Sequence, residues 1–123
     1  MASSEPRGPR QILKAFRYSM QGLREAWTHE PSFRLEVWFF LVLAPLALWL
    51  GESPVERALL FGCLILVLAL ELMNSAVEAI VDKTTPEIHE LAGRAKDMGS
   101  AAVFLAQATV VITWALILLP RWF

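Results

Sequence analysis

The sequence predicts an all-α membrane protein in which an N-terminal amphipathic surface helix precedes three transmembrane helices. First, 56% of the residues are hydrophobic, which leaves too few polar side chains to cover the surface of a soluble domain. Second, three stretches approach the roughly 20 apolar residues that cross a bilayer. Third, the chain contains no repeat and no long linker, so residues 1–123 are expected to form a single domain.

The N-terminal part of the chain divides into a polar segment and an amphipathic helix. Residues 1–9 are expected to be flexible, and they do not resemble a secretory signal peptide. In residues 10–28, at 100° per residue, five apolar side chains fall within about 80° of one another, and basic residues lie opposite. An ordinary helix of a soluble protein is the alternative, but the basic face before a membrane span favours the membrane surface. The apolar side chains are Ile12, Phe16, Met20, Leu23 and Trp27.

The expected spans are residues 33–50, 55–81 and 97–120. Pro45 lies inside the first span and is tolerated where neighbouring helices pack against it. In the turn between the first two spans, Ser53 is expected to cap the second span, with Glu56 completing a capping box. The connection 82–98 is more polar, and Thr85-Pro86 resembles another helix start. Trp38, Trp49 and Trp122 fall near span ends and are expected to be interfacial anchors.

The basic residues predict the orientation of the spans. Nine of the 11 Lys and Arg residues lie before the first span or between the second and third, and two lie on the other side. Because cytoplasmic loops carry the excess of Lys and Arg, we expect a cytoplasmic N-terminus and a C-terminus on the outer side. The net charge of −1 indicates no nucleic-acid partner, and the lone Cys63 excludes an internal disulfide.

A polar stripe follows the inner half of the second span, in "ELMNSAVEAIVDK" (71–83). Relative to Glu71, Asn74 falls at about −60°, Glu78 at about −20° and Asp82 at about +20° around a helix. Such acids cost about 2.5–3.5 kcal/mol each near the bilayer centre, so they usually mark a site or pathway. Interhelical hydrogen bonding alone is the alternative reading of this stripe.

The third span carries a matching stripe of Lys96, Ser100, Gln107 and Trp114, within about 40° of one another. Lys96 lies where the cytoplasm meets the bilayer, and its alternative role is that of a snorkelling interfacial lysine. Gln107 is expected to form an interhelical hydrogen bond, and we assign it no chemistry.

A further pair of acids, Glu30 and Glu36, follows the surface helix. Glu36 either forms a boundary ion pair with Arg34 or Arg24 or joins the acidic group. Carboxylates from different helices with few His or Cys residues nearby suit a hard cation such as Mg²⁺. An adjacent lysine suits nucleotide phosphates. Because neither a P-loop nor a Gly-rich kinase loop occurs in the sequence, such a nucleotide site would have an unfamiliar design.

Three segments together resemble one family. "EAWTHEPSFRLE" (25–36), "ELMNSAVEAIVDK" (71–83) and "HELAGRAKDMGSAAV" (89–103), followed by "ITW", closely resemble the small bacterial integral-membrane diacylglycerol kinases. The likeness extends over about residues 10–118. It implies a homotrimer with composite sites between subunits, located in the bacterial inner membrane. It also implies transfer of the γ-phosphoryl group of MgATP to the primary hydroxyl of diacylglycerol, which gives phosphatidic acid.

The resemblance also implies residue roles. Glu71 matches the catalytic base, with Asn74 beside it, and Glu30 and Glu78 match the metal-binding acids. Gln11 stands where the family has a basic residue, so we expect the adjacent Arg10 to serve as a nucleotide contact. The other residues that match nucleotide contacts are Tyr18, Glu30, Glu78, Glu87, His89, Lys96 and Asp97. Those that match lipid contacts are Ser19, Arg24, Trp27, Ser32, Arg34, Glu36, Ser100 and Trp114.

Two other functions remain as alternatives. The related undecaprenol kinases share the fold and chemistry, and physical argument from these motifs does not separate a polyprenyl alcohol from diacylglycerol. A small proton-coupled multidrug transporter could use one membrane-embedded glutamate such as Glu71. The odd number of spans and the Lys96–Asp97 cluster count against that transporter.

Overall fold

The computed structural model describes residues 8–84 and 90–123, and within them the chain forms helices only. These are α1 (Pro9–His29), α2 (Pro31–Leu50), α3 (Pro54–Thr84) and α4 (Glu90–Trp122). The last three are long and apolar enough to cross a membrane, which confirms the prediction of an all-α chain with three such helices. The segment expected to be flexible lies mostly outside the described residues, as do the Thr85-Pro86 helix start, Glu87 and His89.

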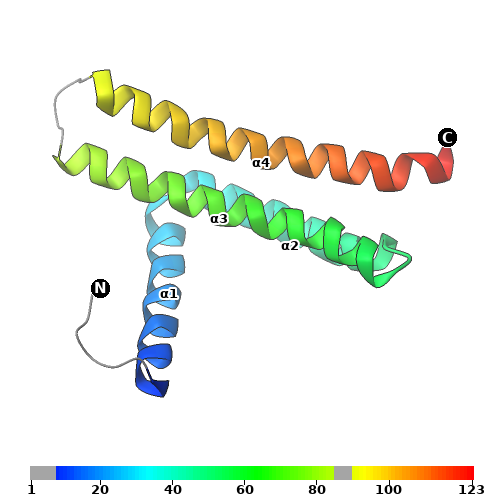
Figure 1. Cartoon of the computed structure of the whole chain (residues 1–123), viewed down its shortest axis with the longest axis horizontal. Helices are drawn as coiled ribbons and strands as arrows, with labels where there is room; N and C mark the ends of the chain where they lie inside the picture. Colours follow the sequence, from blue (N-terminus) through cyan, green and yellow to red (C-terminus); the bar gives the residue numbers. More distant parts are fainter. Residues whose placement is uncertain (1–7, 85–89) are drawn as a thin grey trace.

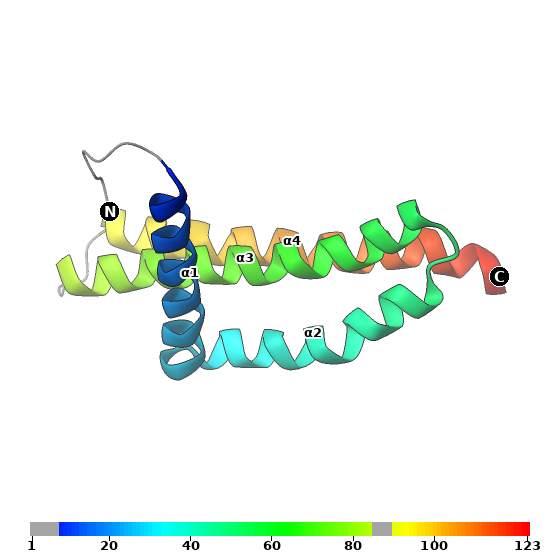
Figure 2. The same ribbon diagram turned by 90° about the horizontal axis from the view of Figure 1, so that it is seen from below.

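Helix α3 is the centre of the arrangement. It packs along α4 on one side and along α2 on the other, while α1 runs crosswise to these three helices (Figures 1 and 2). Successive helices of the bundle run in opposite directions, so α3 and α4 are antiparallel neighbours. A helix that contacts a neighbour on each side is well placed to bring together polar residues from all three.

Glu30 forms the corner between α1 and α2. Its backbone is extended, with φ −117° and ψ 100°, because a residue that precedes proline is disfavoured in the helical region. Its N–H donates to the Ala26 carbonyl at 2.8 Å and its carbonyl accepts from the Arg34 N–H at 3.2 Å. Pro31 begins α2, where its missing N–H costs no hydrogen bond. The proline therefore ends one helix and starts the next, which fixes the position of Glu30.

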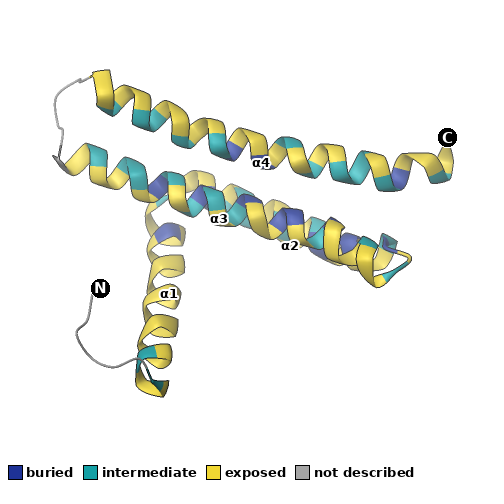
Figure 3. Ribbon diagram, in the orientation of Figure 1, coloured by how far each residue is buried: buried dark blue, intermediate teal, exposed yellow. Residues whose placement is uncertain are grey.

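Apolar packing is concentrated where α2 meets α3. Ala44 and Ala47 of α2 pack against Leu60 and Leu64 of α3, and all four are buried. The alanines allow close approach of the two helices, as small residues do in membrane bundles. Figure 3 shows that buried residues follow the facing sides of the helices, while the outer sides are exposed. Many of these exposed side chains are large and apolar, such as Leu116 at 72% exposure, which suits contact with lipid.

The α2–α3 turn is held by caps of the predicted kind. The Glu56 N–H donates to Ser53 Oγ at 3.1 Å, which confirms Ser53 as the N-terminal cap of α3. The Glu56 carboxylate accepts the N–H of Glu52 at 2.9 Å, one residue before the position expected for a capping box. The same carboxylate also binds a residue near the other end of the chain.

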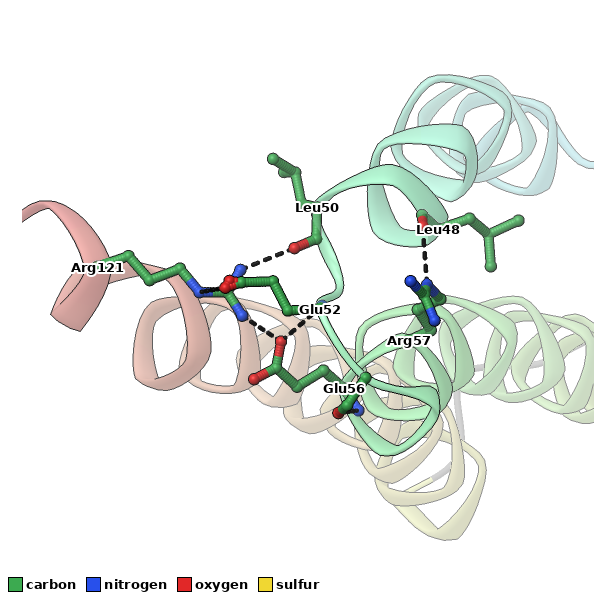
Figure 4. A network of polar contacts seen from close by, with 7 residues as sticks. Leu48, Leu50, Glu52, Glu56, Arg57 and Arg121 are labelled. Atoms are coloured by element: carbon green, nitrogen blue, oxygen red, sulfur yellow. Dashed lines mark hydrogen bonds and ion pairs between the residues drawn. The ribbon is translucent and has the colours of Figure 1, made fainter.

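That residue is Arg121, near the end of α4 (Figure 4). Its guanidinium binds the carboxylate of Glu56, lies 3.4 Å from that of Glu52, and donates to the Leu50 carbonyl at 2.7 Å. We call this set of contacts the Arg121 clasp. It ties the end of α4 to the α2–α3 turn, although the residues are far apart in the sequence.

Candidate active site

Glu71 lies at the centre of a group of acids. It is a buried acid, 5% exposed, and it belongs to the central helix α3. The carboxylates of Glu36, Glu78 and Glu30 are close enough to interact with its charge. These acids come from α2, from α3 and from the α1–α2 corner.

Asn74 connects this group to α4. Its Nδ2 donates to Glu78 Oε1 at 3.2 Å. Its Oδ1 is buried without a hydrogen-bond partner in the described structure, and Gly99 of α4 lies directly against it. A buried acceptor without a donor is costly and calls for an explanation, such as an ion or ligand. The amide therefore faces Glu78 with its nitrogen and Gly99 with its oxygen.

Lys96 lies near the start of α4, at the end of the bundle opposite the α2–α3 turn. Its Nζ is 3.0 Å from Asp82 Oδ1, which joins α4 to the last turns of α3. Both side chains are accessible, at 43% and 65% exposure, so the lysine could exchange this partner for a phosphate. Glu71 lies eleven residues before Asp82, which is about 16 Å along the helix axis. The accessible Lys96 and the buried Glu71 therefore lie at different positions along the bundle axis.

A cavity of about 870 Å³ lies between α1 and α3. Ser19 and Glu30 line it from the side of α1, and Ser75 lines it from α3. Small residues of both helices, such as Gly22 and Ala76, leave the space open. Ser75 is buried, and the sequence analysis omitted it. Its position at about +40° from Glu71 on the helix was the signal that could have found it.

Glu36 has its partner on the far side of the bundle. Gln107 Nε2 of α4 donates to Glu36 Oε1 at 2.7 Å, which confirms the interhelical hydrogen bond expected of Gln107. Arg34, the alternative ion-pair partner, instead donates to the carbonyls of Trp27 and Thr28 at 2.8 and 3.2 Å. These bonds give a donor to carbonyl groups in the last turn of α1, which have no partner within the helix.

The oxygen donors of the acidic group suit Mg²⁺ chemically. In residues 8–84 and 90–123 no three His, Cys, Asp or Glu side chains form a metal-binding group. Mg²⁺ in phosphoryl-transfer sites is commonly held by one or two carboxylates together with waters and substrate phosphates. Glu30, Glu78 and the unpartnered Asn74 Oδ1 are oxygen donors of this kind. The residues thus fit a magnesium ion that is bound together with a nucleotide.

The remaining predicted contacts are spread over three helices. Ser19 Oγ donates to the Ala15 carbonyl within α1 at 2.9 Å, and the Trp27 ring packs on Trp38 of α2 with centroids 6.3 Å apart. Trp114 donates its indole N–H to the Leu60 carbonyl at 3.2 Å, toward the outer half of the bundle. The other described residues of this set have exposed side chains, namely Arg10, Tyr18, Arg24, Ser32, Asp97 and Ser100.

Comparison with known proteins decides the family. The family model described as prokaryotic diacylglycerol kinase matches residues 17–118. The chain belongs to the prokaryotic diacylglycerol kinase family. It is 48% identical over 108 residues to a diacylglycerol kinase of Escherichia coli K12, with 88% of each chain covered. It is 47% identical over 111 residues to that of Haemophilus influenzae, covering 90% of this chain and 94% of the relative. With the Pseudomonas aeruginosa enzyme the identity is 46% over 112 residues, covering 91% of each.

The range matched by the diacylglycerol kinase family model covers the central acids and most of α4. The matched residues 17–118 include Glu30, Glu71, Glu78 and Lys96. Arg10 lies before the matched range, and Arg121 lies after it. Of the residues that form the clasp, only Arg121 lies outside the matched range.

Proposed function

We propose that this protein is an ATP-dependent diacylglycerol kinase, which transfers the γ-phosphoryl group of MgATP to the primary hydroxyl of diacylglycerol. The products are phosphatidic acid and ADP. The observation that supports this reaction most directly is a buried carboxylate, Glu71, deep in a helix of membrane-spanning length, in a chain of the diacylglycerol kinase family. A lipid acceptor presents its hydroxyl to groups at such a depth, whereas a soluble substrate does not.

Glu71 is the proposed general base. It accepts the proton of the acceptor hydroxyl while the hydroxyl oxygen attacks the γ-phosphorus, and the bond to the β-γ bridging oxygen breaks in line. Asn74 keeps Glu78 in place through its 3.2 Å hydrogen bond. Glu78 lies seven positions after Glu71, which corresponds to about 10 Å along the helix and leaves room for the phosphoryl group and the hydroxyl between them.

Nucleotide binding is assigned to the inner end of the bundle. Lys96 would exchange Asp82 for the phosphates of ATP, since its side chain is accessible. Glu30 and Glu78 would hold Mg²⁺, which neutralises charge on the phosphate oxygens when bound. The other proposed nucleotide contacts are Arg10, Tyr18, Asp97, Glu87 and His89. Of these, Glu87 and His89 lie outside the described residues.

The acceptor is assigned to the side of the site that faces lipid. Among the proposed contacts, Glu36 interacts with the charge of Glu71, and Ser19 lines the cavity between α1 and α3. The other proposed lipid contacts surround the end of α1 or lie on α4, namely Arg24, Trp27, Ser32, Arg34, Ser100 and Trp114. A set spread this widely along the bundle suits a long, flexible ligand.

We further propose a homotrimer in the bacterial inner membrane, with a cytoplasmic N-terminus and an outer C-terminus. The crosswise course of α1 and its exposed apolar side chains, such as Ile12 and Phe16, support an amphipathic helix on the membrane surface. Residues 1–123 then form one kinase domain.

The test is an acceptor comparison with purified protein in mixed micelles. With MgATP, diacylglycerol should yield phosphatidic acid, and undecaprenol should be phosphorylated at a much lower kcat/KM. Preference for undecaprenol would replace the proposed acceptor. Absence of ATP consumption with both lipids would contradict the kinase function and leave the transporter as the alternative. ATP consumption that does not depend on any lipid alcohol would contradict phosphoryl transfer to a lipid.

A further inference from the structure

A side-chain hydrogen bond joins two helices whose backbones do not meet. Gln107 Nε2 of α4 lies 2.7 Å from Glu36 Oε1 of α2. In the described part of the chain, no Cα atom of α2 lies within 8 Å of a Cα atom of α4. The hydrogen bond therefore crosses the space between α2 and α4, which α3 lines on one side. We call this hydrogen bond the Gln107–Glu36 bridge.

The bridge lies at the depth of Glu71. Lys96 and Asp82 fix the register of the antiparallel helices α4 and α3 at the inner end. Gln107 and Glu71 each lie eleven residues deeper, about 16 Å along their helices. Glu36, which belongs to the remaining helix α2, interacts with the charge of Glu71. One polar residue from each of α2, α3 and α4 therefore meets at a single level.

The surroundings of the bridge are apolar. It borders a groove of about 280 Å³ whose other lining residues are apolar, among them Phe40, Leu43, Val67 and Val110. A carboxylate or amide without a partner is costly in hydrocarbon, so each side chain depends on the other. A hydrogen bond to a carboxylate is also stronger than a neutral one. The bridge therefore restrains the direction of the Glu36 carboxylate.

We propose that Gln107 is a positioning residue of the lipid-acceptor site, which it serves by holding the Glu36 carboxylate beside Glu71. This inference rests on the proposed kinase function. The restrained carboxylate accepts a hydrogen bond from the glycerol part of the acceptor, whose reactive hydroxyl then faces Glu71. Loss of the Gln107 donor leaves Glu36 free to turn, and acceptor binding weakens. Nucleotide binding, at the level of Lys96, is unaffected.

The first test replaces Gln107 by an apolar side chain of similar shape. For Gln107→Met we expect the KM for diacylglycerol to rise about tenfold, the loss of one hydrogen bond to a charged group, with the KM for MgATP unchanged. The matched control is Thr109→Val, which removes a hydroxyl two residues away that donates to the Leu105 carbonyl of its own helix. The control should behave as wild type. An unchanged KM for diacylglycerol in Gln107→Met, or an equal rise in the control, overturns the proposal.

A charge swap separates positioning from simple stabilisation. Gln107→Glu places two carboxylates against each other and should lower both thermal stability and activity. The double variant Glu36→Gln/Gln107→Glu re-forms the bridge with donor and acceptor exchanged. We expect it to restore the apparent Tm of wild type while the KM for diacylglycerol stays high. Recovery of both properties would show that the bridge only joins the helices.

A third measurement does not depend on catalysis. Dicyclohexylcarbodiimide modifies carboxyl groups in apolar surroundings, and mass spectrometry can quantify its addition at Glu36. Labelling of Glu36 should increase in Gln107→Met and remain at the wild-type level in Thr109→Val. Equal labelling in all three proteins contradicts the proposal, even if the wild-type chain phosphorylates no lipid and the proposed function fails.

Discussion

Gly99 of α4 lies directly against the Asn74 amide of α3, where a methyl group on the glycine would overlap Asn74 Oδ1. The same amide donates to Glu78 through Nδ2. The close approach of two helices therefore determines the orientation of an amide that holds a proposed metal ligand.

Gly99→Ala should impair the site more than the fold. The added methyl forces the Asn74 amide to turn, which breaks its bond to Glu78, and we expect kcat/KM for MgATP to fall about tenfold. The gain in helix propensity, about 1 kcal/mol, offsets part of the packing cost, so the apparent Tm should change little. Gly62→Ala is the control, because nothing lies within 4 Å of the added atom. Equal activity of the two variants would count against this role of Asn74.

Lys96 and Asp82 should respond differently to neutralisation. Lys96→Gln removes the proposed phosphate partner, and the KM for MgATP should rise by at least about tenfold. Asp82→Asn removes the competing carboxylate, 3.0 Å from Nζ, and should leave this KM unchanged or lower it. Steady-state kinetics with varied MgATP measure both effects. Equal increases in the two variants would show that the pair acts as a structural unit.

Shared sites can be detected in mixed trimers. Glu30→Gln should weaken MgATP binding through loss of a metal ligand, and Glu71→Gln should abolish turnover. If a site takes these residues from different subunits, trimers assembled from the two inactive variants regain part of the wild-type activity. Refolding the two proteins together and assaying lipid phosphorylation provides the measurement. Absence of any recovery at every mixing ratio would place both residues in the same subunit's site.

The Arg121 clasp should affect stability without affecting chemistry. Arg121→Met leaves the Glu56 carboxylate and the Leu50 carbonyl without this donor, so the apparent Tm in detergent should fall by several degrees, reflecting about 1–2 kcal/mol. Both kcat and KM should remain unchanged, because the clasp lies at the end of the bundle formed by the α2–α3 turn and the end of α4, whereas Lys96 lies near the start of α4. Arg121→Lys keeps the charge but loses the planar guanidinium, so its apparent Tm should lie between those of wild type and Arg121→Met. An unaltered Tm in Arg121→Met would show that the clasp contributes nothing.

The sequence was sufficient to predict the helices and the polar stripe of α3, because apolar length and helical periodicity are local properties. Glu71, Asn74 and Glu78 were identified in this way, and the cap at Ser53 follows from spacing of the same kind. The partners of Gln107 and Arg121 were not identified. Each binds residues 65 to 71 positions away, and such pairs depend on how the helices rotate and approach one another. Periodicity gives the face of a helix but not the neighbour that this face meets.

The most direct test of the account is a comparison of Glu71→Gln with wild type for binding and turnover. Equilibrium binding of MgATP to the purified protein should be nearly unchanged, because Glu71 lies about 16 Å deeper than Lys96 along the bundle. Formation of phosphatidic acid should fall to background, since the amide cannot accept the proton of the acceptor hydroxyl. Substantial turnover by Glu71→Gln, with MgATP and diacylglycerol both saturating, would contradict the assignment of Glu71 as the base.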